Sequence, residues 1–250
     1  MLTDEQRARY ERDGFLVLRG HLAPALVQRL ATWAEELRAA PDAPGGVRKY
    51  GDDAARDRGE SLLSRVEYVR PFHPELRDLF ACRDLCEPVD RLFGEPAVLF
   101  KDKLNYKLPG TSGFALHQDV QAGWRAYARD FITVMIAIDP MTPENGCLEL
   151  VAGAHREGLI GAQWQPLTAA ELRERPTAPV PADAGDVVLF SGQTPHGSAA
   201  NRTARARRAL FLTYNPVSQG NHYERYFADK LASYPPDIAR EQGRSYRYRV

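Results

Sequence analysis

The feature that most constrains the fold of this chain is a succession of short strand-like segments with no long helix between them. These segments are Ala97–Leu108, Phe131–Ile138, Cys147–Val151, Val187–Phe190 and Arg208–Tyr214. The turn signals that separate them are Pro109-Gly110, Glu144-Asn145-Gly146 and Ala184-Gly185-Asp186. Consecutive short strands of this kind are typical of an antiparallel barrel or jelly roll. We therefore expect a mainly β fold.

Helical signals gather in the N-terminal part of the chain. Thr3 and Gln6 have the spacing of a capping box, and Gly14 can end the short helix that they begin. A longer helix is predicted from Pro24, because apolar residues recur at helical spacing from there until Pro41. We expect these helices to flank the N-terminal end of the β fold.

The stretch Pro41–Glu60 is rich in Gly, Asp and Arg and lacks periodicity, which predicts a loop that is mobile or closes over a site. A strand is predicted at Leu62–Val69 and a helix around Asp84–Phe93. The chain has 250 residues, a length that suits one domain with one core. Residues 1–250 are therefore expected to form a single domain.

The balance of charge bears on the partners of the chain. Lys plus Arg and Asp plus Glu are both 33, so the formal net charge is zero and no global field attracts nucleic acid or an anionic membrane. The apolar runs are shorter than a membrane-spanning helix needs, and the segment Met1–Gln6 is polar where a secretory signal would be basic and then apolar. We expect a soluble, cytoplasmic protein without a polyanionic partner. The three cysteines include no Cys-x-x-Cys pair, which argues against a disulfide framework and a zinc knuckle.

A candidate metal site begins at His117-Gln118-Asp119. Of the six histidines, only His117 has a carboxylate two residues further on. In an extended segment, residues i and i+2 point to the same side, so His117 and Asp119 can offer an imidazole and a carboxylate to one metal ion. Two histidines and one carboxylate that leave one face open suit non-haem Fe(II). A third ligand must come from elsewhere in the chain.

Two histidines compete for the third position. His196 follows the predicted strand Val187–Phe190 after a few residues, and a barrel can bring it close to His117. His155 follows Gly153 at the end of another predicted strand, where a histidine can equally cap a turn. We favour His196, and the residue pattern alone leaves His155 open.

Arginines stand at the start of the last predicted strand. Arg207 and Arg208 cannot both point inward, because strand residues alternate between faces. An inward arginine in an apolar barrel needs an anion, and a planar guanidinium binds a carboxylate through two parallel hydrogen bonds. A dicarboxylate ligand would satisfy this need. Arg205 is expected to lie in solvent.

An ordered set of motifs runs along essentially the whole chain. It comprises Asp13-Gly14-Phe15-Leu16-Val17-Leu18, Lys103-Leu104-Asn105-Tyr106-Lys107, His117-Gln118-Asp119, Glu144-Asn145-Gly146-Cys147-Leu148-Glu149, Gly153-Ala154-His155, Gly185-Asp186-Val187-Val188-Leu189-Phe190, and His196-Gly197-Ser198 with Asn201 and Arg207. This set resembles the phytanoyl-CoA dioxygenase family of Fe(II)- and 2-oxoglutarate-dependent oxygenases. Within the family it looks most like bacterial 2-aminoethylphosphonate-type dioxygenases.

The resemblance implies a double-stranded β-helix, a cupin-like jelly roll, with His117, Asp119 and His196 as the ligands of Fe(II). It implies that 2-oxoglutarate and O₂ are cosubstrates. In the family, the arginine eleven residues after the distal histidine binds the far carboxylate of 2-oxoglutarate, which selects Arg207 over Arg208. The remaining implied cosubstrate contacts are Ser198 and Arg65. By the same analogy His155 belongs to a turn and is not a ligand, and an intact Asp119 implies hydroxylation rather than halogenation.

The resemblance also suggests where the substrate binds. The candidate contacts are Lys101, Lys103, Asn105, Gln118 and Trp124. If the strand that carries the two lysines presents that face to the pocket, the lining suits an anionic or zwitterionic substrate such as an organophosphonate or a natural-product intermediate. The alternative is that the lysines point outward into solvent, as lysines usually do.

The predicted function is hydroxylation of an unactivated C–H bond in a small polar substrate, with succinate and CO₂ as the other products. Two alternatives from other classes remain at this stage. One is a cupin-like zinc or manganese hydrolase or isomerase, because the same three ligands can hold those metals. The other is a non-catalytic small-molecule binding protein on the same scaffold. An inward Arg207 argues for the oxygenase.

Overall fold

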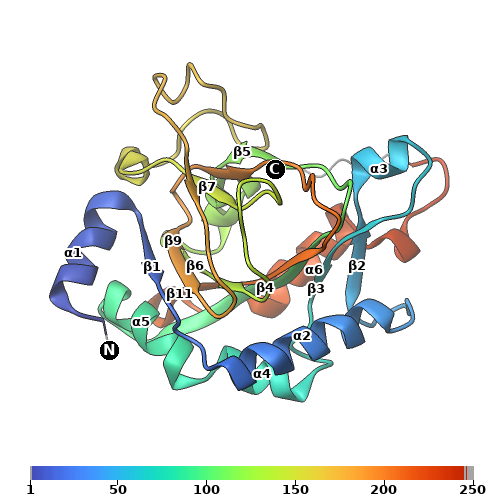
Figure 1. The fold of residues 1–250 in the computed structure, drawn as a ribbon, viewed down its shortest axis with the longest axis horizontal. Helices are drawn as coiled ribbons and strands as arrows, with labels where there is room; N and C mark the ends of the chain where they lie inside the picture. Colours follow the sequence, from blue (N-terminus) through green and yellow to red (C-terminus); the bar gives the residue numbers. More distant parts are fainter. Residues whose placement is uncertain (1, 245, 247–250) are drawn as a thin grey trace.

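The computed structural model describes residues 2–244 and 246, and its strands form two antiparallel sheets (Figure 1). The seven-stranded sheet has the order β1 (Phe15–Leu18), β9 (Val187–Ser191), β6 (Ile132–Ala137), β11 (Arg207–Pro216), β4 (Ala97–Lys107), β3 (Leu63–Glu67) and β2 (Arg48–Gly51). The four-stranded sheet has the order β5 (Phe114–His117), β10 (His196–Ser198), β7 (Leu148–Leu150) and β8 (Ala178–Val180). The two sheets pack through a shared apolar cluster that includes Met135 and Phe190 of the large sheet and Leu150 of the small one.

The chain passes repeatedly from one sheet to the other. It does so between β4 and β5, between β5 and β6, between β6 and β7, between β8 and β9, and on either side of β10. This alternation makes the fold a double-stranded β-helix, as the sequence predicts.

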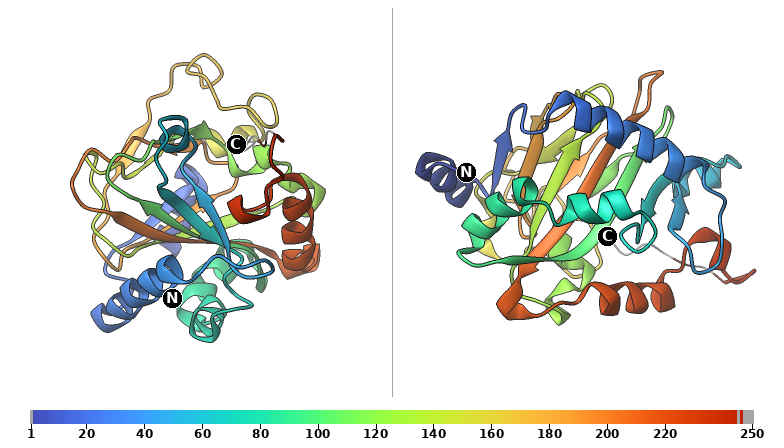
Figure 2. Two further views of the ribbon diagram at one scale, coloured as in Figure 1. Left: turned by 90° about the vertical axis from the view of Figure 1, so that its right-hand side faces the viewer. Right: turned by 90° about the horizontal axis from the view of Figure 1, so that it is seen from below.

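Helices cover the outer face of the large sheet (Figure 2). They are α2 (Pro24–Ala39), α4 (Pro74–Phe80), α5 (Arg83–Phe93) and α6 (Tyr223–Ser233), while α1 (Asp4–Asp13) precedes β1. Leu30 and Trp33 of α2 lie in one buried cluster with Val66 and Leu104 of the sheet. Within the described residues, no helix combines the length and the apolar character that crossing a bilayer requires.

The alternation of strand side chains makes the inner face of the large sheet unusually polar. β4 and β11 pair along their length, with Lys103 opposite Phe211 and Lys107 opposite Arg207. The intervening Leu104 and other apolar residues of these strands lie in the outer cluster under the helices. Lys101 and Lys103 of β4 and Arg207 of β11 therefore face the space between the two sheets, whereas Asp102 and Arg208 lie on the face that the helices cover.

One expectation about the elements is wrong. The stretch Pro41–Glu60 is not a bare loop, because it contains the edge strand β2 and the short helix α3 (Asp53–Asp57). The structure also adds a helix that the sequence analysis did not predict, because α6 follows the last strand and packs against β4. The predicted capping box of Thr3 and Gln6 is confirmed, and Gly14 ends α1 in the left-handed conformation with a φ of 81°.

Candidate active site

Three side chains from separate segments meet at one end of the small sheet. β5 ends at His117, Asp119 begins a 3₁₀ turn (Asp119–Ala122), and β10 begins at His196. His196 lies opposite His117 in the pairing of β10 with β5. The candidate ligand atoms of His117, Asp119 and His196 all lie within 4.8 Å of one another. The structure thus brings together the three ligands chosen from the sequence, and His155 is not part of this group.

Hydrogen bonds from neighbouring groups orient each ligand. The Nδ1 of His117 lies 2.7 Å from the carbonyl of Ala115, and the Nδ1 of His196 lies 3.0 Å from the carbonyl of Thr194. Because a carbonyl only accepts, Nδ1 of each ring carries the hydrogen and Nε2 keeps its lone pair. Asp119 Oδ2 accepts a hydrogen bond from the hydroxyl of Thr133 at 3.0 Å.

The protonation states of the three groups suit a metal ion. Burial lowers the pKa of His117 to about 3, and it also lowers the pKa of His196. Burial alone would raise the pKa of Asp119, but the electrostatic interactions with His196 and Lys103 outweigh it and lower this pKa. At neutral pH the site therefore offers two neutral imidazoles and one carboxylate, and a metal ion displaces no proton there. This donor set fits Fe(II).

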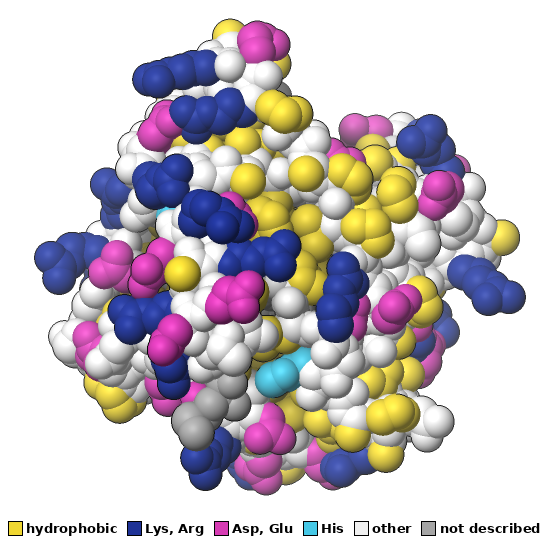
Figure 3. Space-filling model, turned by 60° about the vertical axis from the view of Figure 1, so that its left-hand side comes forward, with side chains coloured by type: hydrophobic (Ala, Val, Ile, Leu, Met, Phe, Trp, Pro, Cys, Tyr) yellow, Lys and Arg dark blue, Asp and Glu magenta, His cyan; other side chains and the backbone are white. Residues whose placement is uncertain are grey.

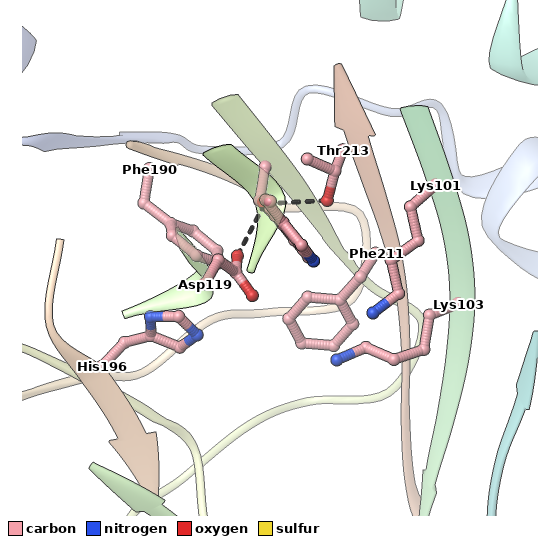
Figure 4. Close-up of a pocket in the computed structure, with 9 residues that line it drawn as sticks. Lys101, Lys103, Asp119, Phe190, His196, Phe211 and Thr213 are labelled. Carbon is pink, nitrogen blue, oxygen red and sulfur yellow. Dashed lines mark hydrogen bonds between the residues drawn. The ribbon is translucent and has the colours of Figure 1, made fainter. Parts of the chain in front are cut away.

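The triad lies between two cavities that share Lys103, Asp119, His196 and Phe211. The first, which we call the arginine side, is also lined by Arg65, Asn105, Phe114, His117, Leu148, Gly197, Ser198 and Arg207. The second, which we call the lysine side, is also lined by Lys101, Trp124, Phe190, Thr133 and Thr213. Figure 4 shows the lysine side, with Lys101 and Lys103 across from Asp119 and His196.

Arg207 points inward and Arg208 points outward, as alternation along the strand requires. The Arg207 side chain is buried, with 3 % of the residue exposed, and its Nη2 donates to the carbonyl of Gly146. Within the part of the chain that the structure describes, its Nε has no hydrogen-bond partner and no carboxylate forms an ion pair with it. Burial lowers the pKa of Arg207 to about 10. A buried cation in this state needs an anion from outside the chain.

Arg208 and Arg205 have different surroundings. Arg208 Nη2 lies 2.7 Å from Asp139, and its Nη1 lies 3.0 Å from Glu35, so its charge is already compensated. Arg205 is exposed, as expected.

The lysines of β4 face the interior, so the outward, solvated alternative is wrong. Lys101 Nζ lies 5.3 Å from the ring centre of Trp124, and Lys103 Nζ lies 4.7 Å from that of Phe211. Burial, and then the charge of Lys101, lowers the pKa of Lys103 to about 7. The negative charge of an anion bound on the lysine side would act against both effects and favour the ammonium form of Lys103.

Gln118 does not line either cavity, which corrects its assignment as a substrate contact. Its buried amide donates to the carbonyls of Gly158 and Gln193 and accepts from the N–H of Ile160. The reason is geometric, since its neighbours His117 and Asp119 point into the site and Gln118 must point away. Its role is to hold the loops behind the triad.

The other implied cosubstrate contacts, Arg65 and Ser198, lie on the arginine side. Arg65 donates from Nε to Glu67 at 2.9 Å, and its guanidinium lies 4.6 Å from the ring centre of Tyr50. The Oγ of Ser198 accepts a hydrogen bond from Lys107 Nζ at 2.7 Å. Sequence reasoning missed Lys107, although its even spacing of four residues from Lys103 already placed it on the same strand face.

Two histidines and a carboxylate on a double-stranded β-helix define a mononuclear non-haem iron oxygenase as the class of this protein. The family model described as "Phytanoyl-CoA dioxygenase (PhyH)" matches residues 10–209. The chain belongs to this family, and it is an Fe(II)- and 2-oxoglutarate-dependent dioxygenase. The alternatives of a zinc or manganese hydrolase and of a silent binding protein are thereby set aside.

Individual relatives agree with this family. The chain is 39% identical to a 2-aminoethylphosphonate dioxygenase of the uncultured bacterium HF130_AEPn_1, over 98% of this chain and 93% of the relative. It is 36% identical to a methylphosphonate hydroxylase of Gimesia maris, over 93% of this chain and 88% of the relative. Among solved structures, it resembles EctD from S. alaskensis with 2-oxoglutarate and 5-hydroxyectoine, with 25% identity, a TM-score of 0.74, and coverage of 87% of this chain and 77% of that one.

Proposed function

We propose that this dioxygenase hydroxylates a C–H bond of a small organophosphonate, with Fe(II) held by His117, Asp119 and His196. The observation that carries the proposal is the division of charge around these ligands. The buried guanidinium of Arg207 faces one side, the ammonium group of Lys101 faces the other, and that of Lys103 lies between the two. One site can thus hold two different anions next to the metal.

The arginine side is assigned to 2-oxoglutarate. Arg207 would bind the far carboxylate through two parallel hydrogen bonds, because its Nε is buried without a partner among the described residues. Ser198 and Arg65 line the same cavity and would complete the binding of this cosubstrate. The opposite end of 2-oxoglutarate would then face the triad.

The lysine side is assigned to the phosphonate. Lys101 and Lys103 would donate to the phosphonate oxygens. Asn105, at the next inward position of β4, lines the arginine side instead, so as a substrate contact it would reach the substrate only from that side. Trp124 closes this side with an apolar wall. Two relatives named for phosphonate substrates support this choice of anion.

The chemistry divides between the bound groups and the chain. Iron and 2-oxoglutarate, when bound, would supply the oxidation: 2-oxoglutarate would take up one oxygen atom of O₂ and become succinate and CO₂, and the other oxygen atom would be inserted into a C–H bond of the substrate. The chain binds both anions, orients the substrate C–H bond beside the metal, and excludes water with Phe190 and Phe211. The reaction needs no side chain as a general base.

The surface agrees with a small substrate. Side chains of both signs are interspersed on the face in Figure 3, so no extended field of one sign favours a polyanion there. We also infer a cytoplasmic setting, because Cys82, Cys86 and Cys147 are free thiols, as is usual in a reducing compartment.

The test is substrate-dependent formation of succinate. Anaerobically purified protein is given Fe(II) and 2-oxoglutarate, and O₂ is admitted with methylphosphonate, 2-aminoethylphosphonate, or the matching sulfonate and carboxylate. We expect at least one phosphonate to raise succinate formation well above the rate without substrate and to gain a hydroxyl group. If the carboxylates do so and the phosphonates do not, the assigned substrate class is wrong.

A further inference from the structure

A buried lysine that no binding role yet includes lies beside the arginine side of the site. Lys107 is the last residue of β4, and it pairs with Arg207 across the sheet. Its Nζ donates to Ser198 Oγ at 2.7 Å, to the carbonyl of Gly146 at 3.3 Å, and to the carbonyl of Ala199. Among the described residues, no carboxylate forms an ion pair with it. Its contacts are hydrogen bonds to neutral acceptors and the ring of Phe114, whose centre lies 5.7 Å from Nζ.

The direction of these hydrogen bonds follows from the chemistry of the groups. An ammonium has three N–H donors and no acceptor, and the two carbonyls can only accept. Lys107 therefore uses all three hydrogens, and Ser198 Oγ must accept one of them. The hydroxyl hydrogen of Ser198 is left to donate elsewhere, and Oγ has no other partner among the described residues. Ser198 lines the cavity into which Arg207 points.

We propose that Lys107 is a positioning residue that makes the Ser198 hydroxyl a donor toward the far carboxylate of 2-oxoglutarate, next to Arg207. This inference rests on the proposed function, which assigns the arginine side to 2-oxoglutarate. Lys107 itself does not reach the carboxylate, because its three donors are already in use. Its effect on the cosubstrate passes through Ser198.

The turn at Gly146 holds this arrangement in place. Its carbonyl accepts from both Lys107 and Arg207, so it sets the two cations side by side. Gly146 has a φ of 73°, and a Cβ at this position would lie 2.7 Å from Lys107 Nζ and 2.2 Å from the carbonyl oxygen of Ala199. Only glycine fits there. The Glu144-Asn145-Gly146 turn is thus built around the two cations.

The charge of Lys107 is favoured by a bound carboxylate. Burial, and then the charge of Arg207, lowers the pKa of Lys107 to about 7, while Glu149 and Asp52 act in the opposite direction. A carboxylate held by Arg207 offsets the repulsion between the two cations. Binding of the cosubstrate therefore stabilises the ammonium form, in which Ser198 must donate.

The experiment is a double-mutant cycle read by binding rather than by activity. The affinity of the Fe(II)-loaded protein for 2-oxoglutarate is measured by calorimetry without O₂ for the parent, Lys107→Met, Ser198→Ala and the double variant. We expect each single variant to bind about tenfold more weakly, the usual effect of one hydrogen bond to a charged group. The double variant should lie within about twofold of Ser198→Ala, because Lys107 acts through that hydroxyl.

Control ligands and variants separate this effect from a loss of structure. 2-Oxobutyrate keeps the keto acid but lacks the far carboxylate, so its affinity should be the same in all four proteins. Ser198→Thr keeps the hydroxyl and should bind like the parent, and Lys49→Met removes a lysine that donates to carbonyls far from the site. If Lys107→Met does not fold, Lys107→Gln takes its place.

Several outcomes would overturn the inference. The first is a double variant whose loss of 2-oxoglutarate affinity equals the product of the two single losses. The second is an equal loss of affinity for 2-oxoglutarate and for 2-oxobutyrate. The third is a Lys107 variant that binds 2-oxoglutarate as tightly as the parent. If Arg207→Ala weakens 2-oxoglutarate binding in the same series, the proposed cosubstrate site stands and only the role of Lys107 fails. If Arg207→Ala has no effect, the proposed function fails first.

Discussion

At the scale of single residues, the backbone decides what the two triad histidines offer. Both rings donate from Nδ1 to a carbonyl two residues earlier in the chain, so both present Nε2 to the same space. His155 has no such arrangement, since its Nδ1 is buried without a hydrogen-bond partner among the described residues and packs against Gly14. The histidines therefore differ in orientation and not only in position.

This difference predicts which histidine variants lose iron. His117→Ala and His196→Ala should each lose Fe(II), because two remaining ligands hold the ion poorly, whereas His155→Ala should keep it. Fe(II) affinity of each purified variant, measured without O₂, checks this expectation. Loss of iron from His155→Ala with retention by His196→Ala would show that the wrong distal histidine has been chosen.

The neighbouring arginines give a second, matched prediction. Arg207→Ala should keep its iron but bind 2-oxoglutarate at least a hundredfold more weakly, because breaking a buried charge pair costs about 3–5 kcal/mol. Arg208→Ala should bind 2-oxoglutarate like the parent, because its guanidinium faces Asp139 and Glu35 on the outside of the sheet. Calorimetric titration of both iron-loaded variants with 2-oxoglutarate measures the two affinities. Weak binding by Arg208→Ala together with parent-like binding by Arg207→Ala would contradict the assignment.

The sequence allowed the triad and Arg207 to be predicted, because a two-residue spacing and a resemblance pointed to the same positions. Asp119 was chosen because residues i and i+2 of an extended segment point to the same side. This reason holds only in part, since β5 ends at His117 and Asp119 already belongs to a 3₁₀ turn. Gln118 was assigned wrongly because the residue between two inward side chains faces the loops. Hydrogen bonds between distant segments, such as Lys107 to Ser198, leave no local pattern in a sequence.

At the scale of elements, β4 is the strand that distributes charge along the site. Lys101 lines only the lysine side, whereas Lys103 lines both sides. The inward face of this one strand thus runs from the proposed phosphonate site to Lys107 beside Arg207. Variants along it should separate effects on the substrate from effects on the cosubstrate.

We expect Lys101→Met to raise the KM of the phosphonate substrate about tenfold or more, since a hydrogen bond from a charged donor is lost. The affinity for 2-oxoglutarate should stay within about twofold of the parent, because Lys101 does not line the arginine side. Steady-state kinetics and anaerobic titration give the two values, with the exposed Arg205→Ala as the control. An equal loss of 2-oxoglutarate affinity would mean that Lys101 serves the whole site.

Elements were predicted best where they are long and regular. The strands β4, β6, β9 and β11 and the helices α1, α2 and α5 all follow clear periodic or capping signals. β2 was missed because its four residues, Arg48–Gly51, have the polar composition of a loop and gain their strand form by pairing with β3. α6 was missed because its buried face, which includes Tyr226, Phe227 and Lys230, combines aromatic side chains with a lysine. Tertiary contacts therefore determine the secondary structure of both segments.

At the scale of the whole molecule, one buried ion pair joins the C-terminal helix to the sheet below the site. Lys230 of α6 donates to Glu67 of β3, which also accepts from Arg65. Glu67 is fully buried, with 0 % of its surface exposed. Burial alone would raise the pKa of Glu67, but the charges of Lys230, Lys101 and Arg65 outweigh it and hold this pKa below the ordinary value.

This pair should make the stability of the protein sensitive to acid. Because the folded pKa of Glu67 is depressed, the unfolded chain takes up the proton first, so the contribution is complete above the ordinary value of 4.5 and is lost as pH falls below it. Glu67→Gln should lower the free energy of unfolding at pH 7 by about 3–5 kcal/mol, because it leaves Lys230 and Arg65 buried without this carboxylate. The stability of the variant should also fall less steeply than that of the parent as the pH drops below 4.5. Urea unfolding at several pH values measures both effects, with Glu60→Gln, which removes an exposed partner of Arg58, as the control. A variant as stable as the parent at pH 7, with an unchanged slope in acid, would show that α6 is held by its aromatic contacts alone.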